Sequence, residues 1–289
     1  MRVGLFGIGQ MGRNHFKVLR RLGHAVRVYD PDIDEINTHD LVGISIFGME
    51  LEKLIEWSEA FIIATPTETH YQLLYQLADA GKPILCEKPL CETSSLAEDV
   101  VEAFGIAKIP LHIGFTERHN PVIRKIKEML DEKNPEIYHV EINRVGSLPP
   151  ERYRQEGAVL DIGIHDYDLT NHLFGSASLL NSHCMSSGGI MVFSHAILEV
   201  HRFPVIVKTS WIDIMKRREI FIYTEDELWM GDLMERTLRV SDRKTGKTDR
   251  MPFAEEPLEI ELREFFEHPE VSSDPGIGAI RLAEEIRGQ

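Results

Sequence analysis

The sequence predicts an α/β protein with two domains, and three observations support this. Up to residue 115, short apolar segments alternate with segments of helical periodicity. The apolar segments contain few polar residues, which is typical of strands buried on both faces of a parallel sheet. After residue 115 the candidate strands are longer, alternate in polarity and are separated by few helices, as in an antiparallel sheet with one wet face. The expected domains are residues 1–115 and residues 116–289.

The boundaries of the helices and strands in the first domain are predicted at the points where an apolar segment ends and turn-forming residues follow. Gly81 ends one helix, and a glycine-containing segment after Phe6 separates the first strand from the first helix. Strands are expected at residues 3–6, 24–29, 60–64, 83–86 and 110–114, and helices at 11–21, 51–57, 69–80 and 94–104.

The second domain begins with a helix, because Pro121 is suited to a first helical turn. A helical segment interrupts the strands, and two tail helices are joined by a connection of Ser, Asp, Pro and Gly. Helices are expected at residues 121–130, 157–174, 258–268 and 276–288, and strands at 138–145, 190–201, 204–214, 218–224, 228–232 and 237–242.

Charge and composition exclude several classes of function. The 289 residues include 32 Lys and Arg against 47 Asp and Glu, a formal net charge of −15. An acidic surface repels nucleic-acid phosphates and anionic lipids, so neither nucleic acid nor a membrane is an expected partner. The sequence has no apolar run of about 20 residues and no signal-peptide pattern. Cys86, Cys91 and Cys184 form no CxxC pair, which favours a reduced, cytoplasmic setting with each as a small core residue.

A glycine turn lies between the first strand and the first helix. Gly7 permits the tight turn, Gly9 lets the backbone approach a pyrophosphate, and Gly12 allows close packing of the helix. The N–H groups at the start of the helix then attract phosphates, which gives an acidic protein a local means of binding an anion. The expected cofactor-binding segment is Gly7, Ile8, Gly9, Gln10, Met11 and Gly12.

Asp30 ends the second strand and supports a dinucleotide ligand. A carboxylate at this place accepts hydrogen bonds from both ribose hydroxyls of NAD and repels the additional phosphate of NADP. The alternative is a turn formed with Pro31, since Asp is common in such turns. We weigh the ribose role more heavily and expect NAD, with NADP the less favoured cofactor.

Two further groups of residues could perform chemistry. Lys88 follows the strand at 83–86, and ligands of parallel sheets bind beyond the carboxyl ends of strands, so Lys88 could hold a substrate oxygen; the alternative is a solvated loop lysine. Asp161 and His165 lie four residues apart, on one helix face with Asp168 nearby, and could accept a proton. Metal ligation with His172 and a solvated helix surface are the alternatives. Clearer ligands would be needed for a metal, so none is expected.

With these motifs in order, the chain resembles the glucose-fructose oxidoreductase, inositol dehydrogenase and MocA family, called Gfo/Idh/MocA below. The resemblance covers nearly the whole chain. It implies a Rossmann domain, a second α/β domain with an open, mostly antiparallel sheet, and hydride transfer between NAD(P) and a sugar or polyol hydroxyl carbon. The motifs that carry it are the glycine turn, Ala64-Thr65-Pro66-Thr67-Glu68-Thr69-His70, Glu87-Lys88-Pro89, and Gly157 with Asp161-x-Gly163-x-His165-x-x-Asp168.

The resemblance also implies roles for individual residues. Lys88 anchors the reacting oxygen, His165 exchanges the proton, and Asp161 orients the substrate or His165; which of Lys88 and His165 is the main proton acceptor stays open. The Lys88-Pro89 bond is expected to be cis. The residues implied to border the cofactor are Thr65, Pro66 and His70, together with Glu87 near the nicotinamide end and Lys88.

The stretch from Gly114 to Pro121 is similar to a motif of UDP-N-acetylglucosamine 3-dehydrogenases within that family, although Phe115 and His119 depart from it. Arg118 and Asn120 follow a strand end and could contact substrate along with Asp161 and His165. Alternatively, Asn120 caps the helix that begins at Pro121.

The expected function is that of an NAD-dependent oxidoreductase acting on a secondary hydroxyl of a sugar, polyol or nucleotide sugar. Two alternatives are a non-catalytic NAD-binding sensor or scaffold, and a reductase of a non-sugar carbonyl or imine. The sheet of the second domain carries many apolar residues for one open face, among them Phe193, Ile197 and Trp211. We therefore expect a homodimer or homotetramer formed through that sheet.

Overall fold

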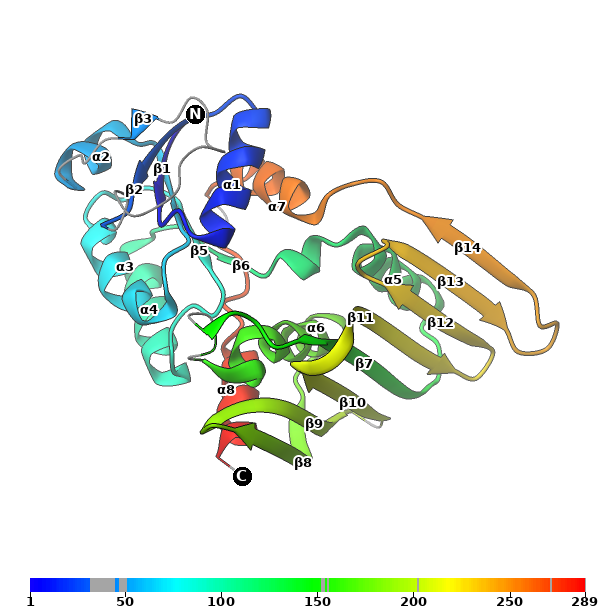
Figure 1. Ribbon diagram of the computed structural model, residues 1–289. Coiled ribbons are helices and arrows are strands. Elements are labelled where there is room, and N and C mark those ends of the chain that lie inside the picture. The colour runs from blue at the N-terminus through cyan, green and yellow to red at the C-terminus, as the bar shows by residue number, and fades with distance from the viewer. Residues whose placement is uncertain are drawn as a thin grey trace. The chain divides into compact units, whose positions relative to one another are not determined.

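The computed structural model describes residues 1–31, 45–46, 51–151, 154, 156–201, 203–270 and 272–288. The chain forms two compact units. The first contains Met1–Phe115 and Leu258–Ile277, and the second contains Thr116–Pro257 and Gly278–Gln289. Figure 1 shows the helices and strands of both units in chain order. Among the described residues, no helix combines the length and the apolar character needed to cross a membrane.

The first unit is built on a six-stranded parallel sheet with the order β3-β2-β1-β4-β5-β6. Strands β2 and β3 extend the sheet on one side of β1, and strands β4, β5 and β6 extend it on the other side. This order places a topological switch point beside β1. The strands are β1 Arg2–Phe6, β2 Ala25–Tyr29, β3 Ser45–Ile46, β4 Ala60–Ile63, β5 Ile84–Glu87 and β6 Leu111–Gly114. The helices are α1 Gln10–Arg21, α2 Leu51–Trp57, α3 His70–Ala78, which follows a 3-10 turn at Thr67–Thr69, α4 Ser94–Ala107 and α7 Pro257–Glu267.

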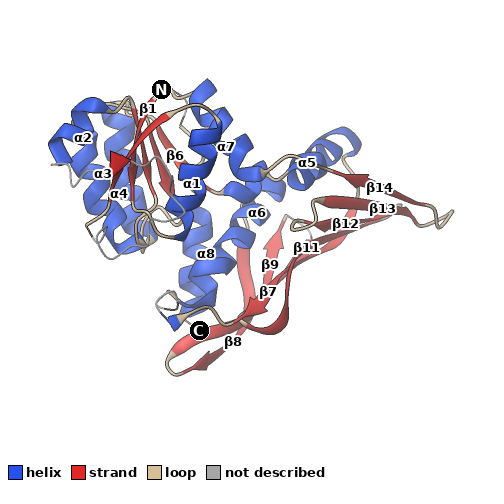
Figure 2. Ribbon diagram, turned by 45° about the horizontal axis from the view of Figure 1, so that its top comes forward, coloured by secondary structure: helices blue, strands red, loops and turns tan. Residues whose placement is uncertain are grey.

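Helices cover both faces of this sheet, as the continuous apolar strands predict. Figure 2 shows α1 and α7 on one face and α2, α3 and α4 on the other. On the first face, Leu5 and Ile62 belong to one buried cluster with Leu19 of α1 and Phe265 of α7. Burial of such side chains typically stabilises a fold by about 1.5–3 kcal/mol each.

The position of α7 differs from the expected division at residue 115. Residues 258–277 pack with the first unit, whereas all of residues 116–289 were expected in the second domain. The physical reason is that Leu258, Leu262 and Phe265 are buried in the first core. The segment after α7 also covers the edge strand β6: the Ser273 hydroxyl accepts the Ile113 N–H at 2.9 Å.

The second unit contains an eight-stranded sheet with the order β14-β13-β12-β11-β7-β10-β9-β8. All neighbours are antiparallel except β7 and β10, which confirms a mostly antiparallel sheet. The strands are β7 Ile137–Ser147, β8 Ser178–Ser187, β9 Ile190–Val200, β10 Phe203–Ser210, β11 Ile212–Thr224, β12 Glu227–Asp232, β13 Thr237–Asp242 and β14 Thr248–Pro252.

Three differences from the expected strands concern this sheet. Strands β8 and β14 were not expected, because both are largely exposed and lack an apolar period. The expected strand at 204–214 ends instead at Ser210, and residues 212–224 form one long strand with an irregular register near its start. Trp211 stands between the two strands.

Helices pack on one face of this sheet (Figure 2). They are α5 Pro121–Lys133, α6 Ile164–Phe174 and α8 Ile277–Arg287, with a 3-10 turn at Thr116–His119 and a π-helical turn at Val159–Gly163 that leads directly into α6. The close approach of α5 requires Gly231 on β12, where a Cβ atom would lie 2.9 Å from Val122.

The other face of the sheet bears a row of half-buried apolar residues. Ile197 pairs with Ile206, and Phe221 pairs with Met230. Phe193 lies on the same face and is half-buried. The placement of Trp211 on that face was wrong: its side chain is 3% exposed because it packs in a cluster with Ala158 and Val192.

Candidate functional site

The glycine turn has the backbone geometry that its sequence predicts. Gly7 has a φ of +86°, and a Cβ atom there would lie 2.5 Å from the carbonyl oxygen of Ala64. A Cβ atom on Gly12 would clash with the carbonyl oxygen of Gly7, so α1 can begin close to the turn only with glycine at that position. A Cβ atom on Gly9 would meet nothing within 4 Å. Gly9 therefore leaves open space at the first residue before the helix.

The N-terminus of α1 adjoins that open space. Gly9 is its N-cap residue, no side chain caps the helix, and its first turn contains no acidic residue. The Arg13 N–H binds the Gly9 carbonyl at 3.0 Å, so the N–H groups of the three preceding residues have no helical partner. Uncapped N–H groups and the positive end of a helix dipole fit the pyrophosphate of a dinucleotide.

Asp30 follows β2 and lies against the same turn. Its Oδ2 accepts the Ile8 N–H at 2.8 Å. This bond fixes the carboxylate beside the glycine turn, which is where a ribose hydroxyl would need an acceptor in a dinucleotide site. The contact links the end of β2 to the glycine turn.

A buried pair of side chains holds the turn at the end of β5. The Nε2 of His15 lies 2.6 Å from Oε1 of Glu87, and the two side chains are 0% and 7% exposed. Gly114 makes room for the carboxylate, because a Cβ atom there would lie 3.0 Å from the Glu87 Cδ. Lys88, the next residue, is half-buried, and the expected cis bond between Lys88 and Pro89 is confirmed.

Sequence reasoning did not identify His15. The residue lies three positions after Gly12, beside the buried Phe16 and on the inward side of α1. A histidine at an inward position of an otherwise apolar helix face is the signal that could have found it, because a buried imidazole needs a polar partner.

His70 joins two loops that were expected to border the cofactor. Its ring is 1% exposed; Nδ1 lies 3.0 Å from the Pro89 carbonyl oxygen and Nε2 lies 3.0 Å from the Thr65 carbonyl oxygen. A carbonyl oxygen only accepts, so both hydrogen bonds form together when both ring nitrogens carry protons. Through these bonds His70 ties the loop after β4 to the Lys88–Pro89 peptide.

In the second unit, Asp161 and His165 lie on either side of a helical junction. Asp161 is in the π-helical turn and His165 is in the first turn of α6, and both are half-buried. Gly163 allows this junction to pack closely, since a Cβ atom there would lie 3.0 Å from the hydroxyls of Tyr167 and Thr209. Single π-helical turns occur often at functional sites.

Arg118 and Asn120, the other two residues expected to contact substrate, form hydrogen bonds within the protein. The Nε of Arg118 donates to Oδ2 of Asp168 at 2.8 Å, and a second hydrogen bond from Nη2 makes the pair bidentate. Asn120 is 1% exposed and is the N-cap of α5, with its Oδ1 accepting the Val122 N–H at 3.1 Å. The capping role, one of the two that the sequence left open, is therefore the one with structural support.

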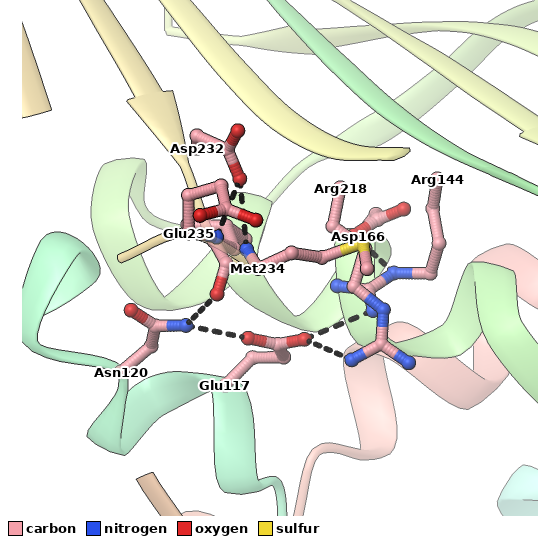
Figure 3. Close-up of polar contacts among 9 residues, drawn as sticks. Glu117, Asn120, Arg144, Asp166, Arg218, Asp232, Met234 and Glu235 are labelled. Atoms are coloured by element: carbon pink, nitrogen blue, oxygen red, sulfur yellow. Dashed lines mark hydrogen bonds and ion pairs between the residues drawn. The ribbon is translucent and has the colours of Figure 1, made fainter. Parts of the chain in front are cut away.

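A buried network of charges lies beside these residues (Figure 3). Oε1 of Glu117 accepts from Nη1 of Arg144 and from Nη1 of Arg218, each at 3.0 Å. Nε of Arg144 donates to Oδ1 of Asp166 at 2.9 Å, and Asn120 donates to the second oxygen of Glu117 at 3.1 Å. The network connects β7 and β11 with the 3-10 turn before α5 and with the first turn of α6.

The two carboxylates of this network respond differently to burial. Burial raises the pKa of Asp166 to about 6, although the charge of Arg144 opposes the shift. Burial also acts to raise the pKa of Glu117, but the charges of Arg144 and Arg218 outweigh it and hold that pKa below its usual value. Sequence reasoning missed this network because its members come from four separate segments.

No three His, Cys, Asp or Glu side chains in the described part of the chain converge in a way that could hold a metal ion. The uncapped start of α1 in the first unit fits an anionic ligand, and Asp161 and His165 in the second unit are residue types suited to acid–base chemistry.

Comparison with known proteins finds a family model and curated relatives that match part of the chain. The model of an oxidoreductase family, Gfo/Idh/MocA, with an NAD-binding Rossmann fold matches residues 1–115. An inositol 2-dehydrogenase of Saccharopolyspora erythraea is 34% identical over 188 residues, which are 61% of this chain and 54% of that protein. An NAD⁺-dependent scyllo-inositol 2-dehydrogenase of Bacillus subtilis is 34% identical over 191 residues, with the same coverage. The chain thus matches about half the length of these curated relatives.

Solved structures share the fold over the whole chain. UDP-N-acetylglucosamine 3-dehydrogenase GnnA from Acidithiobacillus ferrooxidans superposes with a TM-score of 0.88 at 20% identity, covering 100% of this chain and 97% of that one. A levoglucosan dehydrogenase, in complex with NADH and levoglucosan, gives a TM-score of 0.88 at 17% identity, covering 100% of this chain and 96% of that one. At these identities the likeness concerns the fold.

Proposed function

We propose that the protein is an NAD-dependent dehydrogenase acting on a secondary hydroxyl of a sugar, polyol or nucleotide sugar. The match of residues 1–115 to the model of the Gfo/Idh/MocA oxidoreductase family, with its NAD-binding Rossmann fold, supports this proposal. The observation that carries the proposal is the glycine turn, where open space at Gly9 meets the uncapped N-terminus of α1. The inositol dehydrogenases among the relatives support the substrate class.

The sheet order suggests how the cofactor would lie on the first unit. Asp30 follows β2, and the glycine turn follows β1. A dinucleotide with its adenosine ribose at Asp30 and its pyrophosphate at the turn extends toward the ends of β4 and β5. Glu87 and Lys88 stand at the end of β5, so they belong to the nicotinamide side in this proposal. Thr65, Pro66 and His70 would act on the same side through the loop after β4.

Asp30 is the basis for proposing NAD over NADP. Its carboxylate is fixed by the Ile8 N–H, so it cannot easily turn away from a ligand beside the turn. A fixed negative charge repels a phosphate on the adenosine ribose.

The proposed chemistry assigns separate tasks to three residues. NAD, when bound, accepts the hydride from the alcohol carbon. Lys88 donates a hydrogen bond to the reacting oxygen and stabilises its developing negative charge. His165 takes the hydroxyl proton, and Asp161 orients the substrate or His165. The buried His15–Glu87 pair keeps the turn that carries Lys88 in place.

Lys88→Ala and His165→Ala test this assignment. Each variant should lower kcat by about 10²–10⁴-fold, which is the usual contribution of a positioned proton-transfer group. Both variants should still bind NAD, because the proposal assigns the pyrophosphate to the glycine turn and the adenosine ribose to Asp30. Full turnover in both variants would refute the assignment. Lys125→Ala, which removes only a surface ion pair with Glu128 on α5, is the matched control, with unchanged turnover expected.

A further inference from the structure

Three positively charged side chains lie close together on β7 and β11 of the second unit, and the ion pairs that they form do not neutralise them. Arg144 on β7 and Arg218 on β11 lie directly opposite each other in the antiparallel register. Like charges at such positions destabilise a sheet. Lys216, two residues before Arg218, lies over Gly146 of β7, where a Cβ atom would be 3.6 Å from the Lys216 Cγ. Three cations therefore share one small area of a protein whose net charge is −15.

The neighbouring carboxylates do not balance these cations. Glu117 binds both arginines through one oxygen, and Asp166 binds Arg144 only. Lys216 forms no ion pair with a carboxylate of the described residues. The two acidic residues three positions away along the strand pair with other cations: Asp213 lies 3.6 Å from Lys208 and 3.7 Å from Arg217, and Glu219 lies 3.7 Å from Arg217. One positive charge is left over.

The pKa values of Lys216 and Arg218 are both lowered, as expected where positive charges are in excess. The charge of Arg218, together with burial, lowers the pKa of Lys216. Burial and the charge of Arg144 lower the pKa of Arg218. Arg144 is 2% exposed, and its Nη2 has no hydrogen-bond partner among the described residues. A buried guanidinium nitrogen left without an acceptor is uncommon in folded proteins.

Two of the three cations remain within reach of a ligand. The Arg218 side chain is 34% exposed, and Lys216 is exposed. A guanidinium fork and an ammonium group that act together are the donors that proteins use for carboxylates and phosphates. Because Glu117 and Asp166 hold the two arginines, the donors are fixed before a ligand arrives.

We propose that Lys216 and Arg218, supported by Arg144, form a subsite for an anionic group of the substrate, either a carboxylate or a phosphate. The proposal rests on the proposed dehydrogenase function and narrows its substrates to sugar acids, sugar phosphates or nucleotide sugars. Asp166 links the subsite to α6, one residue after His165. Asp166 thus connects Arg144 of the subsite to the helical turn that carries the residue assigned to proton transfer.

The first test measures anion binding without turnover. Inorganic phosphate, added at constant ionic strength, should raise the Tm of the wild-type protein. Lys216→Gln should raise the Tm in the absence of phosphate, because Arg218 and Arg144 repel the Lys216 ammonium more than Glu117 attracts it. The variant should also weaken phosphate binding about 10-fold or more, because a charged hydrogen bond is lost. The control is Lys247→Gln on an exposed hairpin, where phosphate binding should match the wild type. Equal phosphate binding in all three proteins, or none in the wild type, would overturn the proposal.

The second test compares substrates at saturating NAD. Three anionic candidates, glucuronate, glucose 6-phosphate and UDP-N-acetylglucosamine, distinguish a carboxylate from a phosphate and a pyrophosphate, and myo-inositol is the neutral reference. Lys216→Gln should lower kcat/KM for the accepted anionic compound at least about 10-fold more than it lowers kcat/KM for myo-inositol. An equal loss for the neutral compound would contradict a subsite for anions.

The two proposals fail in distinguishable ways. If phosphate binds and Lys216→Gln abolishes its effect while no sugar is oxidised, the anion subsite stands and the dehydrogenase proposal fails. If sugars are oxidised and Lys216→Gln has no effect on any of them, the dehydrogenase proposal stands and the subsite is refuted.

Discussion

Replacing Gly9 with alanine separates cofactor binding from folding. The Cβ atom would meet nothing within 4 Å, and the residue has a φ of −64°, which any L-residue can adopt. The substitution should therefore leave the fold intact. It should even stabilise the protein by about 0.4–1 kcal/mol, because alanine restricts the unfolded chain more than glycine does.

The same methyl group would occupy the space where a pyrophosphate approaches α1. A phosphate pushed outward loses its hydrogen bonds to the N–H groups of the first helical turn. Each such bond to a charged group contributes about 1.5–3 kcal/mol. The loss of two bonds amounts to about 3–6 kcal/mol, or a fall in NAD affinity of at least about 100-fold at 1.4 kcal/mol per factor of ten.

The assay pairs isothermal titration of NAD with thermal unfolding. Gly105→Ala is the matched control, because it adds a methyl group to open space in α4, away from the turn; its NAD affinity should equal that of the wild type. Gly12→Ala should behave in the opposite way to Gly9→Ala and lose stability, since its Cβ atom would clash with the Gly7 carbonyl. Wild-type NAD affinity in Gly9→Ala would refute the assignment of this space to the pyrophosphate.

Further predictions concern protonation, cofactor choice and assembly. Burial raises the pKa of Asp166 to about 6, above its unfolded value, so its stabilising contribution is complete at low pH and is lost as the pH rises through about 6. Between pH 4 and pH 7, the free energy of unfolding of the wild type, measured with denaturant, should fall by about 2–3 kcal/mol relative to that of Asp166→Asn. A difference between the two proteins that does not change with pH would contradict the raised pKa. Asp30→Asn keeps an acceptor for Ile8 and removes the charge, so titration should show the ratio of NADP to NAD affinity rising about 10-fold or more; an unchanged ratio would remove the basis for NAD preference. The half-buried apolar row that includes Ile206 and Phe221 should be covered by a second copy, so sedimentation at micromolar concentration should give a homodimer or homotetramer, and a monomer would count against it.

Local sequence signals predicted the first unit well. The glycine turn needs particular residues at fixed spacing, and its geometry depends on contacts only a few residues apart in the chain or on the adjacent strand, such as Gly12 with Gly7. The N-cap role of Asn120 before Pro121 is local in the same way. The parallel sheet was predictable for a similar reason, because each buried strand is a short, continuous apolar segment that can be recognised without its neighbours.

Long-range partners could not be predicted from the sequence. The apolar face of α7 predicts a buried helix but does not say which core buries it, so its place with the first unit was missed. His15 and Glu87 are 72 residues apart, and Glu117 and Arg218 are 101 residues apart. No local pattern marks such pairs. The exposed strand β8 was missed because edge strands need little apolar character.

The most direct test of the central claim is a single-turnover measurement with the wild-type protein. NAD is bound in stoichiometric amount, a panel of sugars, polyols and nucleotide sugars is added, and the absorbance of the reduced nicotinamide is followed. The account predicts that at least one compound with a secondary hydroxyl reduces the bound NAD, and that Lys88→Ala and His165→Ala slow this step. Tight NAD binding with no reduction by any compound in the panel would contradict it and would favour a non-catalytic NAD-binding protein.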